Sequence, residues 1–172
     1  MTDKTGDDAE FCEFYDQTSR PLWAYLSRGS GSNSAADDLL QETYVRYLQS
    51  AWQKVAPPER RFYLFRIGTN VLRDHFRQRK RNSFDAAGDD VRAPARDPAL
   101  KMDFANILRN EMSQREGQLL WLAYAEEFSH REIAQMTELR EGSIRPLLFR
   151  ARQKLAALLA AAGYGGRSTG RL

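Results

Sequence analysis

The sequence has few of the residues that enzymes and metalloproteins commonly use at their sites. Among 172 residues there are one cysteine, Cys12, and two histidines, His75 and His130. A single cysteine excludes an internal disulfide and favours a reducing cytosol, and two distant histidines give no metal-ligand spacing. A glycine-rich phosphate loop and a nucleophile elbow are also absent. The sequence therefore argues against an enzyme and predicts no metal, no cofactor and no small-molecule substrate.

Long apolar runs are missing too. The longest, residues 119–125 and 155–162, are far shorter than the roughly 18–20 residues of a membrane span. The N-terminus, MTDKTGDDAE, is acidic and polar, whereas a secretory signal starts with basic and then apolar residues. The sequence therefore predicts no membrane span and a cytoplasmic location. Its length suits one medium domain or two small ones.

The chain lacks a large net charge of either sign, but its acidic and basic residues are segregated along the sequence. There are 26 Lys and Arg against 23 Asp and Glu, a net charge of +3. Residues 1–42 and 82–103 are mainly acidic, whereas residues 60–81 and 140–154 are mainly basic. Two basic blocks predict two surfaces for a polyanion. Solvated helix faces are the alternative explanation.

Helical periodicity without strand-like alternation predicts an all-α protein. Residues 83–98 are rich in Ala, Asp, Gly and Pro, which predicts a flexible linker. The linker separates a helical bundle at residues 9–82 from a second small helical domain at residues 99–160. Residues 161–172 are expected to form a disordered tail.

Three helical regions are expected in the first domain. The first, residues 9–27, is expected to be interrupted before Ser19-Arg20-Pro21, which resembles a cap followed by an early-helix proline. The glycine- and serine-rich segment at residues 29–34 (GSGSNS) predicts a loop, with Ser34 as the cap of the second helix. Pro57-Pro58 ends the second helix and permits a third over about residues 59–82.

Hydrophobic spacing divides the second helix into a core face and a polar face. The core face is predicted to hold Leu39, Leu40, Thr43, Tyr44, Tyr47, Leu48, Ala51 and Trp52. The other side carries Asp38, Gln41, Glu42, Val45 and Arg46. Trp23 and Trp121 are also assigned to apolar faces, and Cys12 is expected to be a small packed side chain.

The third helix carries a stripe of basic residues with one asparagine. Arg66, Asn70, Arg73, Arg77 and Lys80 follow at steps of four, three, four and three, so they share one face. Arginine suits phosphates and guanine edges, and asparagine can read adenine through two hydrogen bonds. The pattern favours nucleic-acid binding over a merely solvated helix. His75, near the apolar edge, is expected to be structural.

The second domain contains a helix-turn-helix pattern. Helices are expected through residues 100–112 and 119–125. Ser129 can then cap a short helix with Glu132 at the capping-box position, and a turn at residues 137–140 leads into a further helix. That helix is basic through Arg145, Arg150, Arg152 and Lys154. Ordinary helical hairpins can imitate the pattern.

Several segments resemble bacterial RNA polymerase sigma factors of the extracytoplasmic-function (ECF) group. Residues 37–46 (DDLLQETYVR) resemble region 2.2 of that family, which binds the clamp helices of the largest subunit of core RNA polymerase. Residues 65–77 resemble regions 2.3 and 2.4, which open and read the −10 element. Residues 126–134 and 149–155 resemble region 4.2, which reads the −35 element. The motifs occur in the family's order between Phe11 and Leu155.

The resemblance implies a sigma factor that directs promoter-specific initiation and assists DNA melting. The implied polymerase-binding residues are Asp38, Gln41, Glu42 and Arg46. The implied −10 residues are Arg66, Asn70, Arg73, Arg77 and Lys80, and the implied −35 residues are His130, Arg145, Arg150 and Arg152. The loop at about residues 52–60 would hold an extruded −10 base, and the linker would run toward the RNA exit. The family often uses an anti-sigma factor as a further partner.

Three residues depart from the family pattern. Glu138 replaces a common turn glycine, and Leu147 replaces a base or phosphate donor. If the recognition helix starts near Arg140, Pro146 lies beyond its first turn and removes a backbone hydrogen bond. One hypothesis is that −35 reading is altered or weak and depends on the three arginines of this helix. The alternative is that Pro146 lies at a late helix start and changes nothing.

Two other functions fit parts of the sequence. A dimeric helix-turn-helix transcriptional regulator would explain the second domain but not residues 37–46. A helical RNA-binding or adaptor protein would explain the basic stripe without any promoter selectivity. A sigma factor is expected to bind core polymerase, whereas the helix-turn-helix regulator is not. A sigma factor is also expected to support sequence-selective transcription, whereas the RNA-binding or adaptor protein is not.

Overall fold

A computed structural model describes residues 4–85 and 110–163 of the chain. The chain divides into two compact units, residues 1–82 and 83–172. In the described ranges the regular structure is entirely helical, without a β-strand. The predicted all-α fold with two helical domains is therefore confirmed. None of the helices in the described ranges has both the length and the apolar character needed to cross a membrane.

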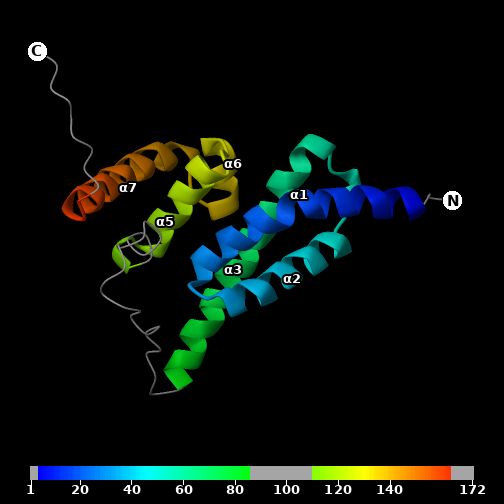
Figure 1. Cartoon of the computed structure of the whole chain (residues 1–172), viewed down its shortest axis with the longest axis horizontal. Helices are drawn as coiled ribbons and strands as arrows, with labels where there is room; N and C mark the ends of the chain where they lie inside the picture. The colour runs from blue at the N-terminus through cyan, green and yellow to red at the C-terminus, as the bar shows by residue number, and fades with distance from the viewer. Residues whose placement is uncertain (1–3, 86–109, 164–172) are drawn as a thin grey trace, which may run out of the picture. The chain divides into compact units, whose positions relative to one another are not determined.

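In its described residues, the first unit contains three long helices (Figure 1). They are α1 (Lys4–Ser30), α2 (Asn33–Gln49) and α3 (Arg60–Asp85). Residues 50–59, which we call the α2–α3 connection, contain two 3₁₀ turns, η1 (Trp52–Lys54) and η2 (Pro57–Glu59). Helices α1 and α2 pack side by side and run in opposite directions.

Large apolar side chains from all three helices form the core of this unit. Those with almost no exposed surface include Leu22, Tyr25, Leu26, Tyr47, Leu64, Phe65 and Leu72. Gly68 lets the helices approach closely, because a Cβ atom there would lie 3.0 Å from Leu22 Cδ1 and 3.5 Å from Thr43 Cγ2. The hydroxyls of Tyr25 and Thr69 also pair across α1 and α3 at 2.9 Å. These contacts fix α2 and α3, which carry the candidate site residues, against α1.

Helix α1 differs from the prediction. It begins at Lys4 and continues through Pro21 to Ser30, so the expected interruption before Ser19 is wrong. A proline inside a helix costs about 3 kcal/mol or more. Leu22, directly after Pro21, and Leu26, one turn later, are fully buried, and burial of two leucines contributes roughly 3–6 kcal/mol. Tertiary packing therefore keeps the helix intact.

The connection between α1 and α2 is shorter than predicted. Gly31, at φ +71°, ends α1, a left-handed conformation that glycine adopts at little cost. Ser32 is the N-cap of α2, and its side chain accepts a hydrogen bond from the Ala35 N–H at 3.2 Å. The prediction of Ser34 as the cap is therefore wrong, because the helix starts two residues earlier.

Three residues assigned to the core lie at the surface. Leu48 is 47% exposed and Ala51 is also exposed, whereas Ala36 is fully buried. Leu48 follows the buried Tyr47 by one residue, which turns it about 100° around the helix and away from the core. Cys12 is exposed as well, so it is not a packed side chain. Trp52, at 4% exposure, does belong to the core as predicted.

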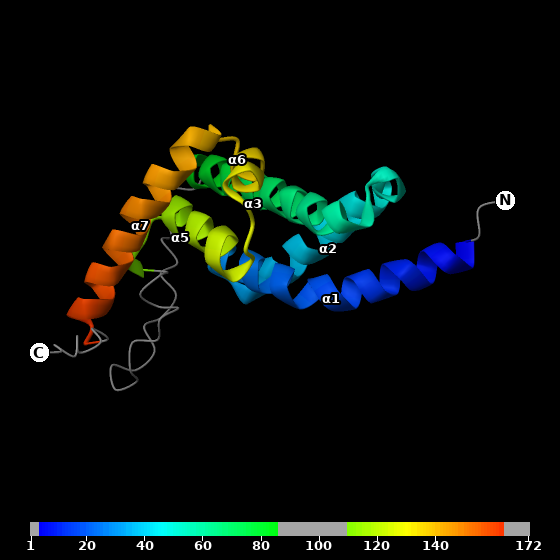
Figure 2. The same cartoon turned by 90° about the horizontal axis from the view of Figure 1, so that it is seen from above.

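In its described residues, the second unit packs its helices around a core of its own. Helix α5 (Gln114–Leu120) continues into a π-helical turn, η3 (Trp121–Ala125), followed by α6 (His130–Thr137) and α7 (Glu141–Ala161). Helices α5 and α6 both pack on α7 (Figure 2). The most buried apolar residues are Leu119, Leu122, Ile133, Met136, Ile144 and Ala151. The predicted burial of residues 119–125 fails at Tyr124, which is 55% exposed, and at Ala125, which is also exposed.

The predicted capping box at the start of α6 is confirmed. Ser129 Oγ accepts from the Glu132 N–H at 3.3 Å, and Glu132 Oε2 accepts from the Ser129 N–H at 2.8 Å. The helix ends at Thr137, and its C-cap residue Glu138 has φ +57°, so a glutamate takes the left-handed conformation that glycine favours. The expected turn over residues 137–140 therefore forms without a glycine.

Three predicted segments lie wholly or partly outside the described residues. The linker, residues 83–98, begins with the last three residues of α3 and is otherwise outside them. The helix expected over residues 100–112 is described only from residue 110, where Met112 is buried. The tail, residues 161–172, begins with the last residue of α7 and is described only to residue 163.

Candidate functional site

The exposed face of α2 holds three of the four predicted polymerase-binding residues. Asp38, Gln41 and Glu42 are all exposed there. Val45 and Leu48, each 47% exposed, continue the same face toward the end of the helix, since residues three and four apart are neighbours on a helix surface. Leu48 had been assigned to the core. Val45, an apolar residue on the polar side of the helix, was the signal that could have revealed an apolar contact surface.

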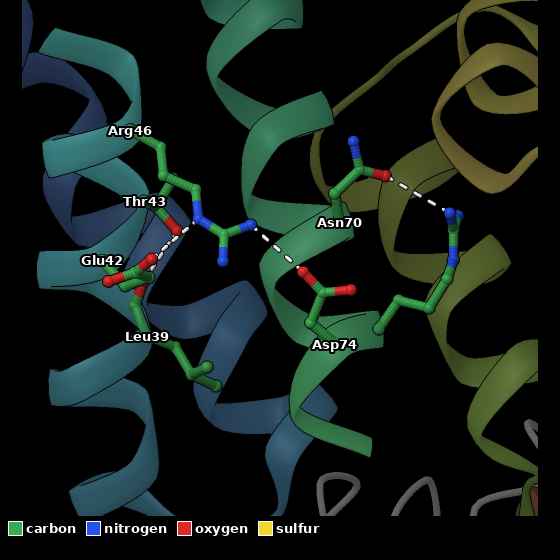
Figure 3. A network of polar contacts seen from close by, with 7 residues as sticks. Leu39, Glu42, Thr43, Arg46, Asn70 and Asp74 are labelled. Carbon is green, nitrogen blue, oxygen red and sulfur yellow. Dashed lines mark hydrogen bonds and ion pairs between the residues drawn. The ribbon is translucent and has the colours of Figure 1, made fainter. Parts of the chain in front are cut away.

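The fourth predicted residue, Arg46, leans toward α3 (Figure 3). Its Nε–H donates to Glu42 Oε1 at 2.7 Å, and its Nη1–H donates to Asp74 Oδ2 at 3.1 Å. The hydrogen bonds to Glu42 and then to Asp74 raise the pKa of Arg46. Arg46 is 43% exposed. It therefore joins α2 to α3 and offsets the charge of Asp74, the one acid among the basic residues of that helix segment.

The five predicted −10 residues lie on one continuous helix, α3. Arg66, Arg77 and Lys80 are exposed, while Asn70 and Arg73 are half-buried. The Arg73 Nη1–H donates to Asn70 Oδ1 at 3.3 Å (Figure 3). This hydrogen bond orients the Asn70 amide within the stripe. The helix therefore presents arginine forks on either side of one oriented amide, an arrangement suited to phosphates and base edges.

His75 lies on the same helix and is half-buried. Burial lowers the pKa of His75, and the nearby charge of Arg79 lowers it further. The folded protein therefore favours the uncharged imidazole.

The second unit gathers three of the four predicted −35 residues around one surface hollow. The hollow has a volume of about 430 Å³ and is lined by Tyr124, His130, Arg145, Leu148, Phe149 and Arg152. Tyr124 and Phe149 are 55% and 52% exposed. Sequence reasoning missed both aromatics, although Phe149 stands inside the basic helix segment. The hollow thus combines cationic groups with two exposed rings.

Arg150 is separate from this group. Its Nε–H lies 3.4 Å from the Pro146 carbonyl oxygen, one turn earlier in α7. It lies five residues from Arg145, and the helical twist turns it about 140° away. The sequence treated these arginines as one set, whereas the fold places Arg150 on another side of the helix.

Pro146 lies well inside α7. The helix begins at Glu141 after the N-cap Arg140, so Pro146 is its sixth residue. The alternative of a late helix start is therefore wrong. Pro146 has no N–H to donate to the Gly142 carbonyl, and Leu147 beside it is half-buried. The buried Ile144 and Leu148 hold the helix against its neighbours on both sides of the proline.

Comparison with known proteins matches both units to one family. Residues 14–82 match the family model for sigma-70 region 2, and residues 109–155 match that for sigma-70 region 4. The chain is 27% identical over 155 residues to the ECF RNA polymerase sigma factor SigM of Bacillus subtilis (strain 168), covering 85% of this chain and 93% of SigM. It is 30% identical over 142 residues to the ECF RNA polymerase sigma factor EcfG of Rhodopseudomonas palustris (strain TIE-1), covering 80% and 78%.

A solved structure has the same architecture over most of its length. It is that of the sigma factor RpoE in a co-crystal with the anti-sigma factor NepR from Bartonella quintana. The TM-score is 0.75 at 25% identity, covering 88% of this chain and 97% of RpoE. These matches confirm the family resemblance inferred from the motifs. The chain belongs to the ECF group of RNA polymerase sigma factors.

Proposed function

We propose that this sigma factor binds core RNA polymerase through α2 and directs it to promoters through α3 and α7. The observation that carries the proposal is the occurrence of both sigma-70 regions in one chain, in the order found in ECF relatives. The sigma factor contributes binding and base capture, and the polymerase supplies the bond-forming chemistry.

The polymerase contact is assigned to the exposed face of α2. Val45 and Leu48 supply an apolar centre, and Asp38, Gln41 and Glu42 flank it with polar groups. An apolar centre with a polar rim is typical of protein interfaces. By family resemblance, the partner is the clamp helices of the largest subunit. Arg46 is assigned to the edge of this contact, because it also bonds to Asp74 on α3.

The −10 contact is assigned to α3 and the α2–α3 connection. Arg66, Arg73, Arg77 and Lys80 would contact phosphates, and Asn70 would read a base. The connection would hold a base extruded from the non-template strand. Capture of such a base offsets the few kcal/mol needed to unpair it, so a binding protein can assist melting.

The −35 contact is assigned to the hollow beside α7. Arg145 and Arg152 would meet phosphates or guanine edges, and Phe149 would meet a thymine methyl group. His130 lies on the same hollow, whereas Arg150 would make a separate backbone contact. Pro146 removes a backbone hydrogen bond from α7 beside this surface, and the half-buried Leu147 has no side-chain donor for a base or phosphate. We therefore propose that −35 recognition is weaker than −10 recognition.

An anti-sigma factor is a candidate partner. RpoE, whose structure resembles this chain, was crystallised with the anti-sigma factor NepR. The exposed apolar residues of α2, Val45 and Leu48, offer a surface that such a protein could cover. The assignment can be tested by measuring how strongly an anti-sigma factor competes with core polymerase for binding. The measurement compares the Val45→Asp variant with the unchanged protein.

Reconstitution with core polymerase on a randomised promoter library tests the function directly. The expected result is enrichment of two spaced elements, which requires core polymerase to be present. Reversing the charge of Asp38 and Glu42 to lysine should weaken core binding and leave the helical circular dichroism spectrum unchanged. The matched control is Glu13→Lys, on an exposed part of α1.

Three outcomes would contradict the proposal. Unchanged affinity of the charge-reversed variant for core polymerase would exclude the assignment of the polymerase contact to α2. Operator binding by a dimer without core polymerase would favour the helix-turn-helix regulator. Binding of RNA and DNA alike, without enrichment of any promoter sequence, would favour the nucleic-acid-binding adaptor.

A further inference from the structure

Arg60, the first residue of α3, is a buried cation outside the basic stripe. Its side chain is only 10% exposed, whereas arginines are seldom buried unless they are paired. The Nη1–H donates to Glu10 Oε1 in α1 at 2.6 Å. The Nε–H donates to the Val55 carbonyl oxygen at 3.1 Å. The guanidinium carbon lies 5.0 Å from the centre of the Trp52 ring.

These three contacts join the start of α3 to α1 and to the first turn of the α2–α3 connection. Trp52 belongs to η1 and Val55 is the C-cap of η1, whereas Arg60 itself is the C-cap of η2. The backbone hydrogen bonds found within the connection span three residues, as from the Val55 N–H to the Trp52 carbonyl and from the Glu59 N–H to the Ala56 carbonyl. Such bonds fix each turn but not one turn relative to the other. Arg60 supplies a contact between them.

The inner side of the connection is held from α1 and α2 as well. The Trp52 ring stacks on Tyr47 with ring centres 5.6 Å apart, and it meets Phe11 of α1 at 6.2 Å. The outer side is different, because Gln53, Lys54 and residues 56–59 are exposed. The inner side of the connection is therefore held in place by packing, while its outer side is accessible. This combination suits a preorganised binding segment.

We propose that Arg60 is a positioning residue that holds the α2–α3 connection in its binding shape, and that Glu10 in α1 completes this contact. The inference rests on the proposed role of the connection in holding a −10 base. Glu10 lies in the acidic N-terminal part of the chain, fifty residues before Arg60 in sequence, and outside every predicted DNA-binding or polymerase-binding residue set. It nevertheless influences promoter opening, because it orients the guanidinium that fastens the connection.

The test uses three variants of the full chain. Arg60→Lys keeps the charge, but one ammonium group cannot reproduce the planar fork that meets Glu10 and Val55 together. Glu10→Gln keeps the size of the side chain and removes its charge. Since Glu10 is 49% exposed, this variant leaves the core intact even where Arg60→Lys disturbs folding. Glu13→Gln is the matched control, an exposed carboxylate one turn further along α1.

Hydrogen–deuterium exchange of the free protein measures the connection without any promoter. For Glu10→Gln and Arg60→Lys we expect exchange in peptides covering residues 50–59 to rise by about tenfold, the effect of losing one charge-assisted hydrogen bond. Glu13→Gln should leave it unchanged. Unchanged exchange in both Glu10→Gln and Arg60→Lys would overturn the proposal.

Transcription by the reconstituted holoenzyme measures the consequence. Both variants should initiate less on a duplex promoter and retain initiation on a promoter whose −10 region is already unpaired, with core affinity unchanged. A merely structural role would lower core affinity and both promoter activities together, and that result would overturn the proposal. Failure of the unchanged protein to initiate would contradict the proposed function, while the exchange experiment would still decide whether Arg60 holds the connection.

Discussion

The two long basic helices, α3 and α7, carry their charges in different ways. On α3 the cations follow one uninterrupted stripe around Asn70, which Arg73 orients through a hydrogen bond. On α7 the cations are divided, because Arg145 and Arg152 line the hollow whereas Arg150 lies near the Pro146 carbonyl. The same residue type thus gives a continuous surface on one helix and a broken surface on the other. The arrangement of cations, more than their number, distinguishes the two candidate DNA contacts.

The two helix-interior prolines sharpen this comparison. Pro21 is half-buried and directly precedes the fully buried Leu22 in α1. Pro146 is exposed on α7, beside the candidate DNA surface. Each removes one backbone hydrogen bond, but only Pro146 removes it from a helix proposed to read DNA. This difference predicts that the −35 element contributes less to initiation than the −10 element.

The largest expected effect is on the promoter itself. Each lost base contact costs about 1–3 kcal/mol, so scrambling several positions of the −10 element should lower initiation by more than about a hundredfold. Scrambling the −35 element should lower it by less, because the surface of α7 is interrupted. Run-off transcription on matched templates measures both changes. Equal losses would show that the interruption has no consequence for recognition.

The next effect separates base reading from phosphate binding on α3. Asn70→Ala should reduce discrimination at one −10 position by about 1–3 kcal/mol. Arg77→Ala should weaken binding to all sequences alike, because a phosphate contact carries no sequence information. Binding of the holoenzyme to promoters with single substitutions measures both. An Asn70→Ala variant with unchanged promoter preference would exclude the base-reading role.

A smaller effect concerns Pro146. Pro146→Ala restores a backbone N–H, which should stabilise the second unit by about 1–3 kcal/mol and increase dependence on the −35 element. Pro21→Ala is the matched control, since it should leave −35 dependence unchanged. Urea unfolding and transcription from the −35-scrambled template measure these outcomes. If Pro146→Ala does not change the dependence on the −35 element, Pro146 does not affect −35 recognition.

The smallest effect concerns the ion pair between Arg46 and Asp74. Both side chains are nearly half exposed, at 43% and 45%, and exposed pairs contribute about 0–1 kcal/mol. Asp74→Asn should therefore change the free energy of unfolding only slightly, and should strengthen DNA binding by removing a negative charge beside the stripe. A double-mutant cycle with Arg46→Met measures their coupling. Weaker DNA binding by Asp74→Asn would indicate that Asp74 positions Arg46 or Asn70 rather than opposing the DNA.

Local signals in the sequence predicted local features well. The capping box of Ser129 and Glu132, the turn before α7 and the spacing of the basic stripe all depend on residues a few positions apart. Such features need no knowledge of the rest of the chain. The motifs that identified the family are likewise short segments in a fixed order.

The remaining features depend on contacts between helices. The course of α1 through Pro21, the exposure of Leu48 and the separation of Arg150 from Arg145 follow from which side of each helix is covered. The contacts of Arg46 with Asp74 and of Arg60 with Glu10 join residues 28 and 50 positions apart. Periodicity cannot predict such pairs, because it gives the faces of a helix but not its neighbours. The sequence by itself determined the all-helical fold class, the family and the charged segments. Only the tertiary structure decided which charged groups face outward and which hold the helices together, because burial and pairing arise when the helices pack.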